Sequence, residues 1–117
     1  GRLVRRAIAW SRSNQSKIER RIKGWLRKLE RQMIIICGHT HRPAFAWAGD
    51  VPYFNTGSCV DLGVITGLEL RHGALTLVRW FIAPSSCADG PPRVLRQVLA
   101  PPKRLHLFAK GHGTGAI

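Results

Sequence analysis

The chain has 117 residues, with 19 Lys and Arg against 6 Asp and Glu, a formal net charge of +13, and 44% hydrophobic residues. This apolar content exceeds that of disordered chains, so we expect at least part of the chain to fold, as one domain or part of one. The longest apolar runs fall well short of the roughly 18 residues that cross a bilayer, and no secretory signal is apparent. Three scattered cysteines, Cys37, Cys59 and Cys87, predict reduced thiols and a cytoplasmic location.

The positive charge is concentrated at the beginning of the chain. Residues 1–31 hold eleven Lys and Arg against two Glu, a net +9, and residues 32–117 carry the remaining +4. Such a block can contact nucleic acid or an acidic membrane surface. We favour a solvated helix face, because Trp10 and Trp25 lie among apolar neighbours and do not interleave with the basic residues.

Residues 16–31 carry the clearest helical pattern. Ser16 and Glu19 have the spacing of a capping box. An apolar stripe follows at steps of three and four residues: Ile18, Ile22, Trp25 or Leu26, and Leu29. Residues 3–8 suggest an earlier helix that ends near residues 11–15.

The next fifty residues resemble strands and turns. Residues 33–37 form a continuous apolar run that predicts a strand covered on both faces, and Gly38 ends it. Residues 52–55 predict a second strand, closed by residues 56–58. Two further strands, at 65–70 and 74–80, are joined by a hairpin turn at His72-Gly73.

Residues 83–117 change in character and hold five of the seven prolines. Residues 93–99 suggest a short strand or helical turn, and much of the rest is expected to be irregular or mobile. We therefore divide the chain into residues 1–82, with basic helices at 1–31 and strands and a metal loop at 32–82, and a Pro/Gly-rich tail at 83–117.

The best candidates for a functional site are Gly38-His39-Thr40-His41, directly after the first strand. Strand ends in α/β layers carry catalytic loops, and glycine lets the backbone turn there. Two imidazoles at this spacing can point into one pocket, and imidazole is a good ligand for zinc, iron or manganese. His-x-His alone also occurs by chance; the preceding strand, Gly38 and the following Arg42-Pro43 favour a metal site.

Two blocks of sequence together resemble the closing motifs of the calcineurin-like metallophosphoesterases. They are Ile34-Ile35-Ile36-Cys37-Gly38-His39-Thr40-His41-Arg42-Pro43 and Tyr53-Phe54-Asn55-Thr56-Gly57-Ser58-Cys59-Val60. The similarity continues through residues 65–70 and 77–80. Residues 98–105 resemble the tail of a bacterial branch described as serine/threonine protein phosphatase-like.

The resemblance implies an α/β fold, as the C-terminal part of a four-layer α/β/β/α sandwich with a two-metal site at its strand ends. In that family a hydroxide that bridges two divalent ions attacks the phosphorus of a phosphate ester, and the ions stabilise the phosphoryl oxygens. Carried over, His39 and His41 would each bind a different ion, of manganese, iron or zinc.

The chain also departs from the family pattern. The upstream motifs Asp-x-His, Gly-Asp and Gly-Asn-His are missing, and Gly49-Asp50 follows the closing histidines, where we expect a turn. Two histidines fall short of the three or four protein ligands of a functional site. We therefore expect a C-terminal fragment that is inactive alone and that needs the upstream part of the same domain as its partner.

Other residues near these motifs have weaker roles. Arg42 could meet a substrate phosphate through its planar guanidinium. Asn55 could touch the metal loop, although Asn before Thr-Gly-Ser more often holds its own turn. Asp61 could orient an imidazole, and Gly38 would have a structural part. Ser58 and Cys59 lack a nearby His–acid pair that would make either a nucleophile.

Overall fold

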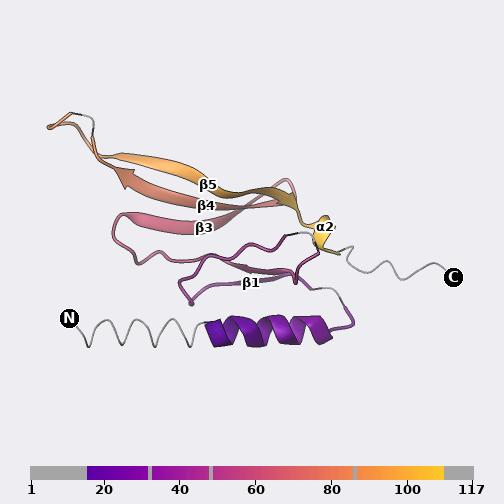
Figure 1. Ribbon diagram of the computed structural model, residues 1–117. Helices are drawn as coiled ribbons and strands as arrows, with labels where there is room; N and C mark the ends of the chain where they lie inside the picture. Colours follow the sequence, from indigo (N-terminus) through magenta and orange to yellow (C-terminus); the bar gives the residue numbers. More distant parts are fainter. Residues whose placement is uncertain (1–15, 32, 48, 86, 110–117) are drawn as a thin grey trace, which may run out of the picture.

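The computed structural model describes residues 16–31, 33–47, 49–85 and 87–109, and the earlier helix expected at residues 3–8 lies outside them. The described chain combines helix and strand, as the sequence predicts. In chain order the elements are a helix at residues 16–28, β1 (Ile35–Cys37), β2 (Tyr53–Asn55), β3 (Val64–Arg71), β4 (Ala74–Ala83), β5 (Arg93–Arg104) and α2 (His106–Ala109) (Figure 1).

The elements stack in three layers. The helix at residues 16–28 lies against the small sheet of β1 and β2, and the sheet of β3, β4 and β5 lies on the other side of it (Figure 1). β1 and β2 are parallel, with Ile35 paired to Tyr53, so both strands end at the same edge. The loops that follow them, which carry the histidines and the Asn-Thr-Gly-Ser segment, therefore meet.

The first strand is covered less than its apolar sequence predicts. Ile36 is 51% exposed, whereas Ile35 and Cys37 are half-buried. The expectation of cover on both faces is therefore wrong at Ile36. A two-stranded sheet is narrow, and the described elements leave the side chain of Ile36 open to solvent.

The helix packs through Leu26, which is 8% exposed, whereas Trp25 is 49% exposed. Leu26 therefore belongs to the inward stripe and Trp25 does not. Ile18, which was expected in the stripe, is also largely exposed. A three-residue strand spans only about 10 Å, which is shorter than a helix of three turns, so the sheet cannot cover the whole stripe.

β3 and β4 form the predicted hairpin. His72 and Gly73 form its turn, with φ values of 50° and 75°. Positive φ at both central residues is the geometry that matches the right-handed twist of the flanking strands. The register pairs Arg71 with Ala74 and Val64 with Phe81.

β5 overturns the expectation of an irregular segment after residue 99. The strand runs from Arg93 to Arg104 and extends the sheet beyond residue 82. It includes Pro101 and Pro102, which lie in the part of the tail that was expected to be irregular. β5 is an edge strand, and its pairing with β4 shifts register on both sides of Leu77, so the prolines fall where the ladder is irregular.

The core lies between the two sheets. Phe54 from β2 packs edge-on against Phe45 and against Phe108 from α2, with ring centroids 5.1 Å apart in each pair. Leu75 of β4 and Ala46 complete this cluster. α2 therefore contributes to the core of the same unit.

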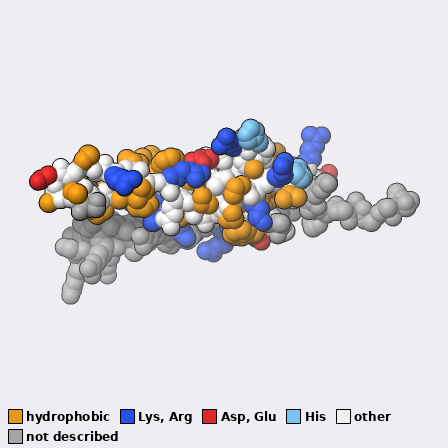
Figure 2. All heavy atoms as spheres, turned by 90° about the horizontal axis from the view of Figure 1, so that it is seen from above, with side chains coloured by type: hydrophobic (Ala, Val, Ile, Leu, Met, Phe, Trp, Pro, Cys, Tyr) orange, Lys and Arg blue, Asp and Glu red, His pale blue; other side chains and the backbone are white. Residues whose placement is uncertain are grey.

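The outer face of the larger sheet, turned away from this core, is apolar and open. Figure 2, seen from that side, shows hydrophobic side chains across the sheet with Lys and Arg among them. We name this surface the outer sheet face; its exposed hydrophobic members are Ile65, Trp80, Ile82, Val94 and Val98. Arg96 and Glu69 form an ion pair across it.

Candidate metal site

The two histidines of the Gly-His-Thr-His segment lie in the loop that follows β1. Their imidazole centroids are 6.4 Å apart, with ring planes inclined by 56°. Both side chains are exposed. The loop thus presents two imidazoles at the carboxyl edge of a parallel sheet, tilted relative to one another.

The unusual backbone of this loop falls on the histidines themselves. His39 and His41 have φ values of 73° and 57°, whereas Gly38 is not among the positive-φ residues. Gly38 was expected to supply the turn, so that interpretation is wrong in detail. Positive φ disfavours residues with a Cβ, and the loop therefore needs support from its surroundings.

Thr40, between the two histidines, supplies part of that support and is only 3% exposed. Its hydroxyl donates to Glu19 Oε1 on the helix (3.4 Å) and accepts from Asn55 Nδ2 (2.9 Å). Asn55, which is fully buried, also donates to the Tyr53 hydroxyl (3.0 Å) and accepts from the Gly57 amide through Oδ1 (2.9 Å). Asn55 thus holds its own turn and the histidine loop.

The carboxylate of Glu19 also affects the ionisation of neighbouring groups. Burial, and then the charge of Glu19, raises the pKa of the Cys37 thiol. Burial is also the main cause that raises the pKa of Tyr53, with a smaller contribution from Glu19. Both groups are therefore held in their neutral forms near neutral pH.

Ser58 contacts the second histidine directly. Its Oγ lies 3.3 Å from His41 Nδ1, and Ser58 is buried. Its backbone is tied to β3 through the Thr66 hydroxyl (2.8 Å) and the Thr66 amide (2.9 Å). In the tautomer in which Nδ1–H donates to Ser58 Oγ, the lone pair of His41 Nε2 is free for a metal ion.

The remaining sequence candidates stay at the surface. Arg42 and Asp61 are exposed, and the backbone carbonyl of Asp61 accepts from the Val64 amide. Gly49-Asp50 forms a turn, as expected, in which Asp50 Oδ2 accepts from the Trp47 amide (3.2 Å). Glu19, Thr40 and Tyr53 were not expected at this site, because only the fold brings them together.

The described residues supply only some of the ligands that a metal site needs. Among the residues that the structure describes, no group of three or more His, Cys, Asp or Glu could hold a metal ion. His39 and His41 supply two imidazoles, whereas functional zinc sites use three or four protein ligands. The described residues therefore do not form a complete metal centre.

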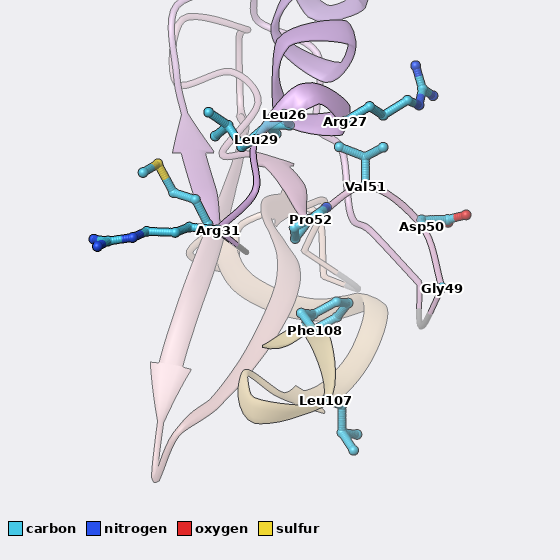
Figure 3. Close-up of a pocket in the computed structure, with 11 residues that line it drawn as sticks. Leu26, Arg27, Leu29, Arg31, Gly49, Asp50, Val51, Pro52, Leu107 and Phe108 are labelled. Carbon is cyan, nitrogen blue, oxygen red and sulfur yellow. The ribbon is translucent and has the colours of Figure 1, made fainter. Parts of the chain in front are cut away.

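A cavity of about 430 Å³ lies at the opposite end of β1 and β2, next to the C-terminal end of the helix (Figure 3). Leu26, Leu29, Pro52 and Phe108 line it, together with Arg27, Arg31, Asp50 and Leu107. Its lining mixes apolar and charged residues, and neither His39 nor His41 belongs to it.

Comparison with known proteins adds no further information on family. The chain matches no protein-family model, no curated protein and no solved structure. Within the described ranges, no helix is long and apolar enough to cross a membrane. The assignment of function therefore depends on the site and on the motifs.

Proposed function

We propose that this chain is the C-terminal portion of a dinuclear-metal-dependent phosphoesterase with a four-layer α/β/β/α sandwich. In this proposal His39 and His41 each bind one of two neighbouring divalent ions. The observation that carries it is the buried support of the loop, through Thr40, Asn55 and Ser58, beneath two exposed imidazoles. Strained backbone that is held in place by buried neighbours is found most often at functional sites, which supports the proposal.

The incomplete donor set is part of the proposal. The remaining ligands would come from an upstream part of the same domain, which is the partner we expect. The outer sheet face is consistent with this, because a fourth layer would cover its exposed Trp80, Ile82 and Val94. Alone, the chain is expected to have no phosphoesterase turnover.

Bound ions would supply Lewis-acid chemistry, stabilising charge on the phosphoryl oxygens of a phosphate-ester substrate. The chain itself contributes orientation: Ser58 fixes the ring of His41, and exposed Arg42 lies next to it in the loop. Imidazole ligands alone do not select between manganese, iron and zinc.

The proposal is tested by hydrolysis of p-nitrophenyl phosphate with added Mn²⁺, Fe²⁺ or Zn²⁺. We expect no turnover by this chain, and metal-dependent turnover by a longer protein that contains it. His39→Ala or His41→Ala in the longer protein should abolish that turnover. Unchanged hydrolysis in both variants would contradict the proposal.

A second candidate function, binding of nucleic acid, is favoured by one observation. Trp25 is half-exposed on the helix, in line with Arg21 and Lys28, so an aromatic ring and basic groups share a surface. Salt-sensitive binding of single-stranded oligonucleotides that weakens in Trp25→Ala would support this candidate. No retardation of the oligonucleotides at low salt would eliminate it.

A further inference from the structure

The residues beneath the histidine loop form a continuous chain of hydrogen bonds, which we name the Thr40 network: Glu19, Thr40, Tyr53 and Asn55. We propose that the Thr40 network is a positioning device that fixes the relative orientation of His39 and His41, and that Glu19 extends it to the helix. This inference rests on the proposed function, because it concerns the same two imidazoles. It adds roles for residues that bind neither metal nor substrate.

The hydrogen-bonding capacity of Asn55 shows why it positions the loops and does not itself bind a metal ion or a substrate. A side-chain amide has two N–H donors and one oxygen. The donors are used by Thr40 Oγ1 and the Tyr53 hydroxyl, and the oxygen accepts from the Gly57 amide. With both donors engaged and the side chain fully buried, Asn55 acts through the loops that it joins.

Thr40 transmits this support to the strained backbone. It lies between two residues with positive φ, a conformation that is unfavourable for a residue with a Cβ. Its amide donates to the Gly38 carbonyl (2.9 Å), and its hydroxyl is held on both sides, by Asn55 and by Glu19. Fixing Thr40 therefore restrains the residues on either side of it, which are the two histidines.

Glu19 connects the loop to the N-terminal layer. Four residues further along the same helix face, the Lys23 ammonium lies 5.3 Å from the centroid of the Tyr53 ring. The helix thus contacts both ends of the Thr40 network, through Glu19 at Thr40 and Lys23 at Tyr53. A shift of the helix would change the support of the histidines directly.

The test uses the 117-residue chain, with zinc alone as the probe. Imidazole NMR resonances report zinc binding at His39 and His41, and amide hydrogen exchange of Gly57 and Thr40 reports the loop in the absence of metal. Thr40→Val removes the hydroxyl at nearly constant size and should weaken zinc binding about tenfold. This is the lower end of the loss in metal affinity seen when residues that orient metal ligands are replaced. It should also accelerate exchange of both amides.

Three further variants make the test specific. Thr40→Ser keeps the hydroxyl and should restore zinc binding to near the wild-type affinity. Thr76→Val makes the same substitution at a buried threonine in β4 and should leave zinc binding unchanged. Should Thr40→Val fail to fold, Glu19→Ala removes the helix connection and should show the same changes more weakly.

Wild-type zinc affinity and wild-type exchange rates in Thr40→Val and Glu19→Ala would overturn the inference. Equal losses in Thr40→Val and Thr76→Val would do the same, because they would indicate general destabilisation. Failure of zinc to shift either imidazole in the wild-type chain would mean that the two histidines need the upstream ligands before they hold zinc, and the hydrolysis experiment would still decide the proposed function. The exchange rates would then decide separately whether the Thr40 network holds the loop.

Discussion

The loop that carries the two histidines depends on glycine at position 57, where there is no room for a side chain. Its φ is 85°, and a Cβ there would lie 1.9 Å from Thr66 Oγ1 and 3.1 Å from Pro43 Cβ. Thr66 cannot turn aside without loss, because its hydroxyl accepts from the Ser58 amide. The close approach of these segments is what places Ser58 beside His41.

We therefore expect Gly57→Ala to lower the free energy of unfolding by about 3 kcal/mol or more, from backbone strain and overpacking together. Gly49→Ala is the matched control, since Gly49 has φ of 93° but open space around its Cβ position. It should cost about 1 kcal/mol. Urea denaturation of both variants measures the difference, and equal costs would show that the contact with Thr66 is unimportant.

Tyr53 gives the chain a measurable response to alkaline pH. Burial raises its pKa above the ordinary 10.0, so the folded state holds the phenol proton more tightly than the unfolded state. The resulting stability is fully present below pH 10 and is lost as the pH rises toward the folded pKa, at about 1.4 kcal/mol per pH unit.

Tyr53 is the only tyrosine, so the absorbance of tyrosinate reports its titration directly. The midpoint should lie above that of free tyrosine, and Tyr53→Phe should show a smaller loss of unfolding free energy above pH 10. Cys37, whose pKa is also raised, is present in both proteins and cancels in this comparison. An ordinary midpoint would contradict the buried placement of the phenol.

At the scale of elements, the helix at residues 16–28 is held to the sheet by a narrow apolar contact. Leu26 is the buried member of that contact, whereas the neighbouring Trp25 is half-exposed. Leu26→Ala should cost about 2–3 kcal/mol of unfolding free energy, toward the lower end for buried leucines because the site is close to the surface.

Trp25→Ala provides the comparison and should change the unfolding free energy by about 0.5 kcal/mol or less. Thermal melts followed by circular dichroism measure both variants. A larger loss from Trp25→Ala than from Leu26→Ala would mean that the helix docks through its other candidate face.

At the scale of the whole molecule, we expect the outer sheet face to promote association of the chain with itself. Apolar side chains from three strands are exposed together, and Val94 is 66% exposed on an edge strand. Exposed patches of this kind, especially beside free strand edges, promote self-association.

Val94→Lys should weaken self-association about tenfold or more, because burying a valine contributes about 1.5 kcal/mol or more. Leu70→Lys adds the same charge at a comparably exposed residue whose register position is on the other face of the sheet. It should have a smaller effect. Sedimentation velocity over a range of concentrations distinguishes the two, and equal effects would point to general charge repulsion.

Local patterns were sufficient to predict several elements. The Tyr53–Asn55 strand follows from a short apolar run before turn residues, and the β3–β4 hairpin follows from His72-Gly73, whose backbone can adopt positive φ. The helix is indicated by its apolar spacing, although it ends at residue 28 and not 31. These features depend on neighbours in sequence, which is why the sequence alone determined them.

The tertiary structure decided the rest. β5 passes through Pro101 and Pro102 because β4 offers an edge with an irregular register, a partner that local propensity cannot reveal. The spacing of His39 and His41 is enough to predict that the two imidazoles lie in one loop. The hydrogen bonds that Glu19 and Asn55 make to Thr40 could not be predicted, since those residues lie 21 and 15 positions from it. Hydrogen bonds between distant segments form only when the layers pack, and that packing determines what holds the two imidazoles in place.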